Sequence, residues 1–518
     1  MSVLTVENVS HGFGARAILA EASFRLLRGE HVGLIGANGE GKSTFLNIIT
    51  GQLTPDEGKV EWSNRVIVGY LDQHSVLTKG KTIRDVLREA FQNMFDMEAE
   101  MLGLYNKMGE AAPEEVEKMM EEVGEIQDML EHGSFYIIDA KIEEVANGLG
   151  LGDIGLDRDV ADLSGGQRTK VLLTKLLLQN PTILILDEPT NYLDVEHIEW
   201  LKRYLKAYDN SFILVSHDIP FLNEVVNVIY HVENAVLTRY TGDYEQFQQM
   251  YAMRKSQETK AYERQQQEVD RLEDFIARNK ARVATRGMAN SRQKRLDKME
   301  IMEKPREKPK PTFQFREART PSRFVVEAKG LVLGYNEPLT KPVDITLERG
   351  QKVAIRGVNG LGKSTLLKTL LGYIKPVDGK VILGDYLQAG YFEQESSRNN
   401  SRTAIEEVWD EFPGLTNFEV RAALARCGLT NEHITSQMMV LSGGENAKVR
   451  LCKLMLKDVN WLVLDEPTNH LDIEAKAELK RALIEYKGTI LLVSHEPEFY
   501  EDWVTAVWNV ENWTTKIV

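Results

Sequence analysis

Short, mostly apolar runs alternate along the chain with longer segments that mix apolar and charged residues. These runs occupy residues 31–35, 183–186, 213–215, 352–355, 461–464 and 490–493. Apolar runs of this length are typical of strands buried on both faces of a parallel sheet. Because helix-length segments separate them, the pattern predicts an α/β fold with a largely parallel sheet.

Four motifs in the first half of the chain recur in the same order in the second half. Gly-x-Asn-Gly-x-Gly-Lys-Ser-Thr comes first, and Leu-Ser-Gly-Gly, Leu-Asp-Glu-Pro-Thr-Asn and Val-Ser-His follow it. The first copies begin at Gly36, Leu163, Leu186 and Val215, and the second copies begin at Gly357, Leu441, Leu464 and Val493. The repeat predicts two related domains.

The spacing between the motifs repeats as well. From the serine of Leu-Ser-Gly-Gly to the next motif's aspartate is 23 residues in both halves (164 to 187, 442 to 465). Only the interval from an earlier glutamine to that serine differs, being 91 residues (73 to 164) against 48 (394 to 442). We therefore predict one domain at 1–242 with a helical arm inserted at about 88–135, a linker at 243–322 and a second domain at 323–518.

The glycine-rich motif predicts a phosphate-binding loop. Its glycines let backbone N–H groups surround phosphates, and the helix that follows adds a favourable dipole. Lys42 and Lys363 would reach the β- and γ-phosphates of a nucleotide, and Ser43 and Ser364 would hold Mg²⁺. A glycine-rich turn that matches by chance is the alternative for one copy, but two copies in register make it negligible.

Paired carboxylates follow a later strand in each half. Asp187 and Asp465 end apolar runs, which places a carboxylate where Mg²⁺ sits. Glu188 and Glu466 come next and are placed to polarise an attacking water. A surface acidic pair is the alternative, which the fixed distance from two phosphate-binding loops disfavours.

The remaining two motifs gain their meaning from position. A histidine that ends a strand is more often structural than catalytic. Only the shared spacing of 30 residues from the aspartate (187 to 217, 465 to 495) favours a catalytic role for His217 and His495. Leu-Ser-Gly-Gly at a helix start offers a second anion site. Since each domain has its own phosphate-binding loop, this second site is best explained if it serves the other domain's nucleotide.

Together these motifs resemble the ATP-binding cassette superfamily over essentially the whole chain outside the linker and arm. The resemblance implies two cassettes arranged head to tail, with ATP and Mg²⁺ between one cassette's loop and the other's Leu-Ser-Gly-Gly. The implied first site contains Gly36, Asn38, Gly39, Gly41, Lys42, Ser43, Thr44, Gln73, Asp187, Ser442 and Gly444, with Glu188 and His217 as catalytic residues. The implied second site contains Gly357, Asn359, Gly360, Gly362, Lys363, Ser364, Thr365, Gln394, Asp465, Ser164 and Gly166, with Glu466 and His495 as catalytic residues. The implied Mg²⁺ ligands are Ser43, Gln73, Asp187, Ser364, Gln394 and Asp465, and the implied adenine-stacking residues are Phe13 and Tyr335.

Composition limits the branches of the superfamily that the chain can resemble. Two cysteines among 518 residues, Cys427 and Cys452, exclude a disulfide scaffold and a cysteine-ligated iron–sulfur cluster. No run approaches the roughly 18 apolar residues that span a bilayer, and the first residues show no signal peptide, so the cytosol is the expected location. The tandem cassettes, the Pro-Thr-Asn-x-Leu-Asp extension in both copies and the charged linker resemble the ABC-F family of ribosome-associated ATPases.

The linker favours helix and carries an unusual charge. Residues 243–286 lack glycine and proline, and a second helical stretch is expected at 288–303, which predicts a hairpin with its tip at 286–291. Residues 278–298 hold eight basic residues against one acidic residue, so this +7 segment belongs to a chain of net charge −15. A solvated helical face is the alternative to an RNA-binding tip. By analogy with the family, the residues placed near RNA are Arg278, Lys280, Arg282, Arg286, Asn290, Arg292, Lys294 and Arg295.

The arm differs from the linker, since residues 96–131 hold 12 acidic residues and two lysines. A ribosomal protein is therefore a better expected partner for it than RNA, and a solvated decoration is the alternative. The whole pattern predicts a monomeric ATP-hydrolysing ABC-F protein that binds the ribosome without a membrane partner. Its linker would approach large-subunit RNA, the P-site tRNA and the peptidyl-transferase region. Antibiotic protection of the ribosome and the ATPase subunit of a transporter with a separate membrane partner are the alternatives.

Overall fold

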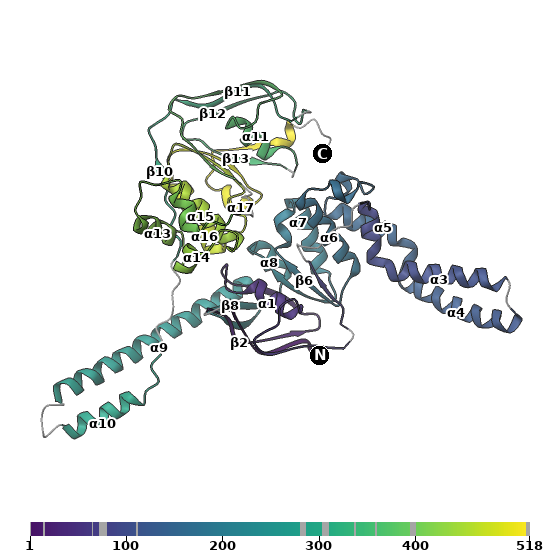
Figure 1. The fold of residues 1–518 in the computed structure, drawn as a ribbon, viewed down its shortest axis with the longest axis horizontal. Helices are drawn as coiled ribbons and strands as arrows, with labels where there is room; N and C mark the ends of the chain where they lie inside the picture. Colours follow the sequence, from purple (N-terminus) through teal and green to yellow (C-terminus); the bar gives the residue numbers. More distant parts are fainter. Residues whose placement is uncertain are drawn as a thin grey trace.

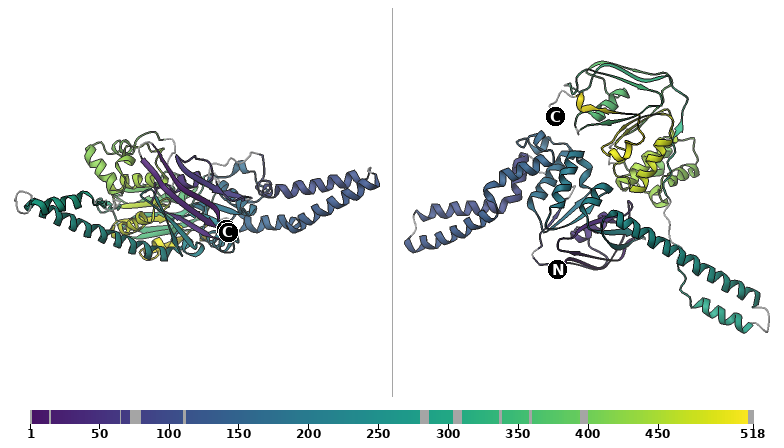
Figure 2. Two further views of the ribbon diagram at one scale, coloured as in Figure 1. Left: turned by 90° about the horizontal axis from the view of Figure 1, so that it is seen from below. Right: turned by 180° about the vertical axis from the view of Figure 1, so that it is seen from behind.

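The computed structural model describes residues 2–13, 16–64, 66–71, 80–109, 112–279, 286–302, 310–335, 338–357, 360–393 and 400–513. Two cassettes lie side by side, and two helical hairpins project from them in different directions (Figures 1 and 2). Within this described part, no helix has the length and apolar character that crossing a membrane requires.

Each cassette is built on a largely parallel sheet, as the sequence predicts. The strand order is β5-β6-β7-β3-β8-β9 in the first cassette, where only β9 runs antiparallel to its neighbour, and β15-β17-β18-β13-β19 in the second. The first sheet comprises β3 (His31–Ile35), β5 (Val68–Tyr70), β6 (Ile183–Asp187), β7 (Ser211–Val215), β8 (Val228–Glu233) and β9 (Val236–Thr241). The second comprises β13 (Lys352–Arg356), β15 (Ala389–Phe392), β17 (Trp461–Asp465), β18 (Thr489–Val493) and β19 (Ala506–Asn509).

A three-stranded antiparallel sheet, which the sequence pattern does not predict, accompanies each parallel sheet. The orders are β2-β1-β4 and β12-β11-β14. The strands are β1 (Ser2–Phe13), β2 (Arg16–Leu27), β4 (Glu57–Trp62), β11 (Phe324–Val332), β12 (Val343–Glu348) and β14 (Asp378–Leu383). A short parallel pair, β10 (Arg316–Glu317) with β16 (Asp458–Val459), joins the end of the linker to the second cassette.

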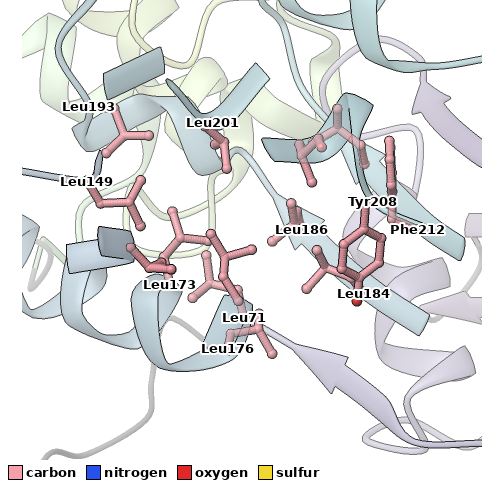
Figure 3. Close-up of a cluster of buried hydrophobic side chains, with 14 of the residues drawn as sticks. Leu71, Leu149, Leu173, Leu176, Leu184, Leu186, Leu193, Leu201, Tyr208 and Phe212 are labelled. Atoms are coloured by element: carbon pink, nitrogen blue, oxygen red, sulfur yellow. The ribbon is translucent and has the colours of Figure 1, made fainter. Parts of the chain in front are cut away.

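Helices cover the parallel sheets and enclose the main cores. In the first cassette, Leu184 and Leu186 of β6 and Phe212 of β7 pack with Leu176 and Leu201 of the covering helices (Figure 3). The helices of the first cassette are α1 (Lys42–Ile49), α2 (Ile83–Arg88), α5 (Ile138–Gly148), α6 (Gly165–Gln179), α7 (Val195–Lys206) and α8 (Ile219–Val225). Those of the second are α11 (Lys363–Leu370), α12 (Ala404–Trp409), α13 (Asn417–Arg426), α14 (Asn431–Thr435), α15 (Gly443–Leu456), α16 (Ile473–Glu485) and α17 (Pro497–Tyr500).

The arm is a hairpin of α3 (Gln92–Met108) and α4 (Pro113–His132) (Figure 1). Leu104 of α3 packs with Val123, Ile126 and Leu130 of α4 along one narrow apolar seam. The remaining faces are largely exposed, which is the expected arrangement for two amphipathic helices with an acidic surface.

The linker is also a hairpin, of α9 (Tyr244–Asn279) and α10 (Arg286–Asp297). The 36 residues of α9 extend about 54 Å at 1.5 Å per residue. The predicted tip at 286–291 is wrong, because these residues lie within α10. Gly287 costs the helix about 1 kcal/mol relative to alanine, and Ala289, two residues further along, is only 1% exposed.

Candidate functional site

The phosphate-binding loop of each cassette leads from a buried strand into a helix. Gly41 and Gly362 precede α1 and α11 in the left-handed region, with φ of 100° and 92°, a conformation that favours glycine. Lys42 Nζ donates hydrogen bonds to Gly36 O at 2.8 Å and to a second loop carbonyl, and Lys363 Nζ donates to the equivalent Gly357 O at 2.6 Å. Each lysine is thereby held inside the loop that it is expected to serve.

The paired carboxylates lie at the carboxyl ends of β6 and β17, directly beside these loops. Ser43 Oγ donates to Asp187 Oδ2 at 3.3 Å. Glu188 and Glu466 adopt the left-handed region with φ of 49° and 48°, which is strained for a residue with a side chain. Their backbone N–H groups donate to the carbonyls of Val215 and Val493, at 2.9 and 3.0 Å. The same strained turn in both cassettes therefore fixes where each glutamate side chain begins.

Each glutamate is buried against a histidine. The Nε2–Oε1 distance is 3.5 Å from His217 to Glu188 and 3.1 Å from His495 to Glu466. Burial raises the pKa of both glutamates to about 8, and burial lowers the pKa of both histidines to about 3. Each pair thus combines a neutral imidazole with a carboxyl group whose proton affinity lies near neutrality, which suits a general base.

The first predicted site is assembled from both cassettes. Asn38 of the first loop donates from Nδ2 to His470 O of the second cassette at 2.7 Å, and its Oδ1 lies 3.1 Å from His217 Nε2. A cavity of about 260 Å³ contains predicted residues from both halves. Those lining it are Asn38, Gly39, Gly41, Lys42, Ser43, Thr44, Asp187, Glu188, His217, Ser442 and Gly444.

Only some residues of the second predicted site belong to the described part of the chain. Lys363 Nζ lies 2.8 Å from His495 Nε2, beside Glu466. Thr365 is buried in α11. Ser164 caps α6 and is exposed, and Gly166 is half-buried in its first turn. That Ser164 and Gly166 complete this site remains a prediction.

Several predicted ligands lie outside the described residues, namely Gln73, Gln394, Asn359 and the side chain of Phe13. Tyr335, the other residue predicted to stack on adenine, is 68% exposed in the loop after β11. Such exposure leaves its ring accessible to a nucleotide base.

Asp194 and Asp472, which end the two Pro-Thr-Asn-x-Leu-Asp extensions and were not assigned to a site from the sequence, also act across the interface. Burial lowers the pKa of Lys42 and His217 in the first cassette, and the charge of Asp472 in the second cassette partly opposes both shifts. Burial likewise lowers the pKa of Lys363 and His495, and the charge of Asp194 partly opposes those shifts. Both aspartates stand seven residues after the motif aspartate (187 to 194, 465 to 472), a repeated spacing that could have identified them.

A second cavity of about 240 Å³ lies between the cassettes and is lined by both glutamate–histidine pairs, Glu188 with His217 and Glu466 with His495. Lys476 of α16 also lines it. Burial raises the pKa of Glu188, and the positive charge of Lys476 partly opposes this rise from across the interface.

The residues of the two sites fit Mg²⁺. Asp187 and Ser43 offer oxygen ligands side by side, the donor type that Mg²⁺ prefers. Asp465 Oδ1 is buried and accepts no hydrogen bond from the described residues. Among the residues that the structure describes, no cluster of three or more His, Cys, Asp or Glu could hold a metal ion. Mg²⁺ is commonly bound through one or two protein carboxylates together with nucleotide phosphates.

The linker presents a basic surface that extends beyond the residues selected from sequence. Arg292 stacks over the ring of Phe275 at 3.5 Å, and Arg295 pairs with Glu268 at 2.6 Å. Arg264 and Arg271 of α9 join them around a groove of about 490 Å³. Of the other predicted residues, Arg278, Asn290 and Lys294 are exposed, whereas Lys280, Arg282 and the side chain of Arg286 lie outside the described residues.

Comparison with known proteins adds to this geometry. A family model described as "ABC transporter" matches residues 19–191 and 340–469, and a second model with the same description matches residues 230–315. The chain is 66% identical to the ABC transporter ATP-binding protein YfmM of Bacillus subtilis (strain 168), over 100% of both chains. It is 37% identical to ABC transporter F family member 2 of Arabidopsis thaliana, covering 99% of this chain and 77% of the relative.

Among solved structures, the complex of archaeal ribosomal stalk protein aP1 with archaeal ribosome recycling factor aABCE1 has a TM-score of 0.57 at 20% identity. The match covers 97% of this chain and 87% of that one. A model of ribosome-bound archaeal Pelota and ABCE1 also has a TM-score of 0.57, at 21% identity, covering 96% of this chain and 76% of that one. At these identities the likeness shows a common fold.

Proposed function

The chain belongs to the ABC-F family of ATP-binding cassette proteins and is an ATPase, and from this premise we propose that it binds the ribosome and acts on translation. In this proposal the linker approaches large-subunit RNA, the P-site tRNA and the peptidyl-transferase region. The observation that carries the proposal is the arginine-rich groove on a hairpin that projects from an otherwise acidic chain (Figure 1).

In this proposal, closing and opening of the paired cassettes controls ribosome binding. Because Ser442 and Gly444 share one cavity with the first phosphate-binding loop, ATP and Mg²⁺ bound there would contact both cassettes and favour their closed arrangement. We assign the same role at the second site to Ser164 and Gly166. Hydrolysis would remove the γ-phosphate interactions and allow the cassettes to separate, which releases the ribosome.

The linker is placed to sense this closure. Helix α9 follows β9 of the first cassette directly, and the chain returns to the second cassette at β10, which pairs with β16. A change in the relative position of the two cassettes would therefore move the two ends of the hairpin with respect to each other. Arginines on its projecting part suit contacts with RNA phosphates, whereas the acidic body would be repelled by them.

Ribosome co-sedimentation of a chain with Glu188→Gln and Glu466→Gln tests this proposal. Glutamine keeps the size of the side chain but cannot act as the base, so the variant should bind ATP and remain closed. We expect it to pellet with ribosomes in ATP at several times the level of the unmodified chain, and to lose this excess when ADP replaces ATP. Equal co-sedimentation of the two chains in ATP would contradict the proposal. Recovery of the unmodified protein with a hydrophobic partner in a membrane fraction would favour a transporter subunit.

The linker groove gives a second prediction. Replacing Arg264, Arg271, Arg292 and Arg295 by alanine should weaken ribosome binding. For each interaction with a phosphate that is removed, the slope of log affinity against log salt should become shallower by about 0.7–0.9. Arg254→Ala is the matched control, since Arg254 lies on α9 before the groove and pairs with Glu258 at 2.8 Å. Circular dichroism should show unchanged helix content. An unaltered affinity and salt slope in the fourfold variant would remove the linker's proposed role.

A further inference from the structure

The helices that begin at the two Leu-Ser-Gly-Gly motifs, α6 and α15, are here called the signature helices, and they differ at their third residue. Glu445 follows Ser442-Gly443-Gly444 in the second cassette, where the first cassette has Gln167. Both side chains close a capping box at the helix start. Ser442 N donates to Glu445 Oε2 at 2.9 Å, and Ser164 N donates to Gln167 Oε1 at 3.0 Å. The second cassette therefore has a carboxylate where the first has a neutral amide.

This carboxylate is in an unfavourable place for ATP binding. Glu445 is 7% exposed, and the three residues before it line the cavity of the first ATP site. A helix start attracts phosphate through its N–H groups and its dipole, and a negative side chain in the same turn opposes that attraction. A buried charge without a compensating partner would also cost folding free energy.

One side chain compensates this charge. His433 of α14 places Nε2 at 3.1 Å from Glu445 Oε1, and the two side chains are only 12% and 10% exposed. Thr430 N donates to Nδ1 of the same ring at 3.4 Å, so the ring proton of the neutral form is on Nε2. Nε2 is therefore the ring atom in close polar contact with the carboxylate, without the alignment of a hydrogen bond to Oε1.

We propose that His433 is a positioning residue for ATP at the first site, acting through Glu445 on the Ser442-Gly443-Gly444 turn. It orients the glutamate in the capping box and offsets its charge beside the bound phosphates. The inference rests on the composite ATP site of the proposed function but not on the ribosome. It makes the two ATP sites chemically unequal, since Gln167 needs no such partner.

ATP binding to the chain with Glu188→Gln and Glu466→Gln, followed with a fluorescent ATP analogue and no ribosomes, tests this inference. His433→Ala should weaken the binding of one of the two nucleotides roughly 10-fold, as expected when a buried charged group loses its polar partner. Adding Glu445→Gln should restore that affinity, because the amide recreates the arrangement of the first cassette. Gln167→Glu should weaken the other nucleotide.

Steady-state turnover of the His433→Ala chain with both catalytic glutamates intact provides the second measurement. We expect a higher KM for ATP with a nearly unchanged kcat, because His433 does not touch the reacting atoms. A nucleotide affinity unaffected by His433→Ala would overturn the inference. So would a loss of affinity that persists after Glu445→Gln, since it would show a merely structural role. Failure of ribosome binding in the separate co-sedimentation experiment would leave these measurements unaffected.

Discussion

A chain carrying both Glu188→Gln and Glu466→Gln is expected to hydrolyse ATP about 10²–10⁴-fold more slowly than the unmodified chain, the usual contribution of a general base. Both glutamates directly follow parallel strands beside a phosphate-binding loop and lie within 3.5 Å of a histidine. Their pKa values, raised by burial to about 8, allow each to take a proton near neutral pH. Glutamine fills the same space but has no basic oxygen.

The variant should still bind ATP, because its expected phosphate ligands are the loop N–H groups and the lysines. Phosphate release at saturating ATP measures the loss, and binding of the fluorescent analogue shows that the sites are intact. Glu199→Gln is the matched control, since Glu199 lines the same inter-cassette cavity but pairs with Lys202 at 2.6 Å. A fall in turnover of less than tenfold would show that another group acts as the base.

The parts of the fold that the sequence predicts are those where chemistry requires particular residues at fixed intervals. The phosphate-binding loops, the strands before them and the helices beginning at Lys42 and Lys363 agree with the structure. In each case a short buried strand gives a continuous apolar run, and a tight turn requires glycine. Because each of these elements occurs at the same spacing in both halves of the chain, each half supports the assignment made in the other.

The two antiparallel sheets could not be predicted because their pattern is irregular. Strand β1 shifts register against β2 between Val6 and Val9, and β11 shifts against β12 between Ala328 and Leu331. Each shift interrupts the two-residue alternation by which a half-buried strand is recognised. The predicted linker tip is misplaced because Gly287 favours a helix end by local preference, whereas in the structure it lies inside α10, where Ala289 is buried.

The sequence selects residues for the candidate site but does not show the contacts between them. The sequence identifies Asn38 as part of a loop, yet only the fold shows that it reaches His470 of the other cassette. The pairing of His433 with Glu445 also depends on how α14 packs beside α15. These contacts join segments that no local pattern relates.

Gly444→Ala should lower ATP turnover about tenfold or more, because overpacking typically costs about 1–3 kcal/mol where the two cassettes meet. A Cβ atom on Gly444 would lie 2.0 Å from Asn38 Nδ2 and 2.4 Å from His470 O. The carbonyl of His470 belongs to the backbone of the same cassette and cannot rotate away. Asn38 can rotate, but this would break its hydrogen bond to His470 O across the interface. The backbone of Gly444 is not in the left-handed region, so alanine is excluded by packing rather than by conformation.

Gly165→Ala, in the matching motif of the first cassette, is the control, since a Cβ there would have no neighbour within 4 Å. Both substitutions add one methyl group at the start of a signature helix, so their difference reports the crowding of Gly444 against Asn38 and His470. ATP turnover and binding of the fluorescent analogue should fall for Gly444→Ala and change little for Gly165→Ala. Equal effects would mean that the contact between Gly444 and Asn38 does not limit the working cycle. A selective loss would show that ATP hydrolysis depends on the close packing of Gly444 against Asn38 and His470.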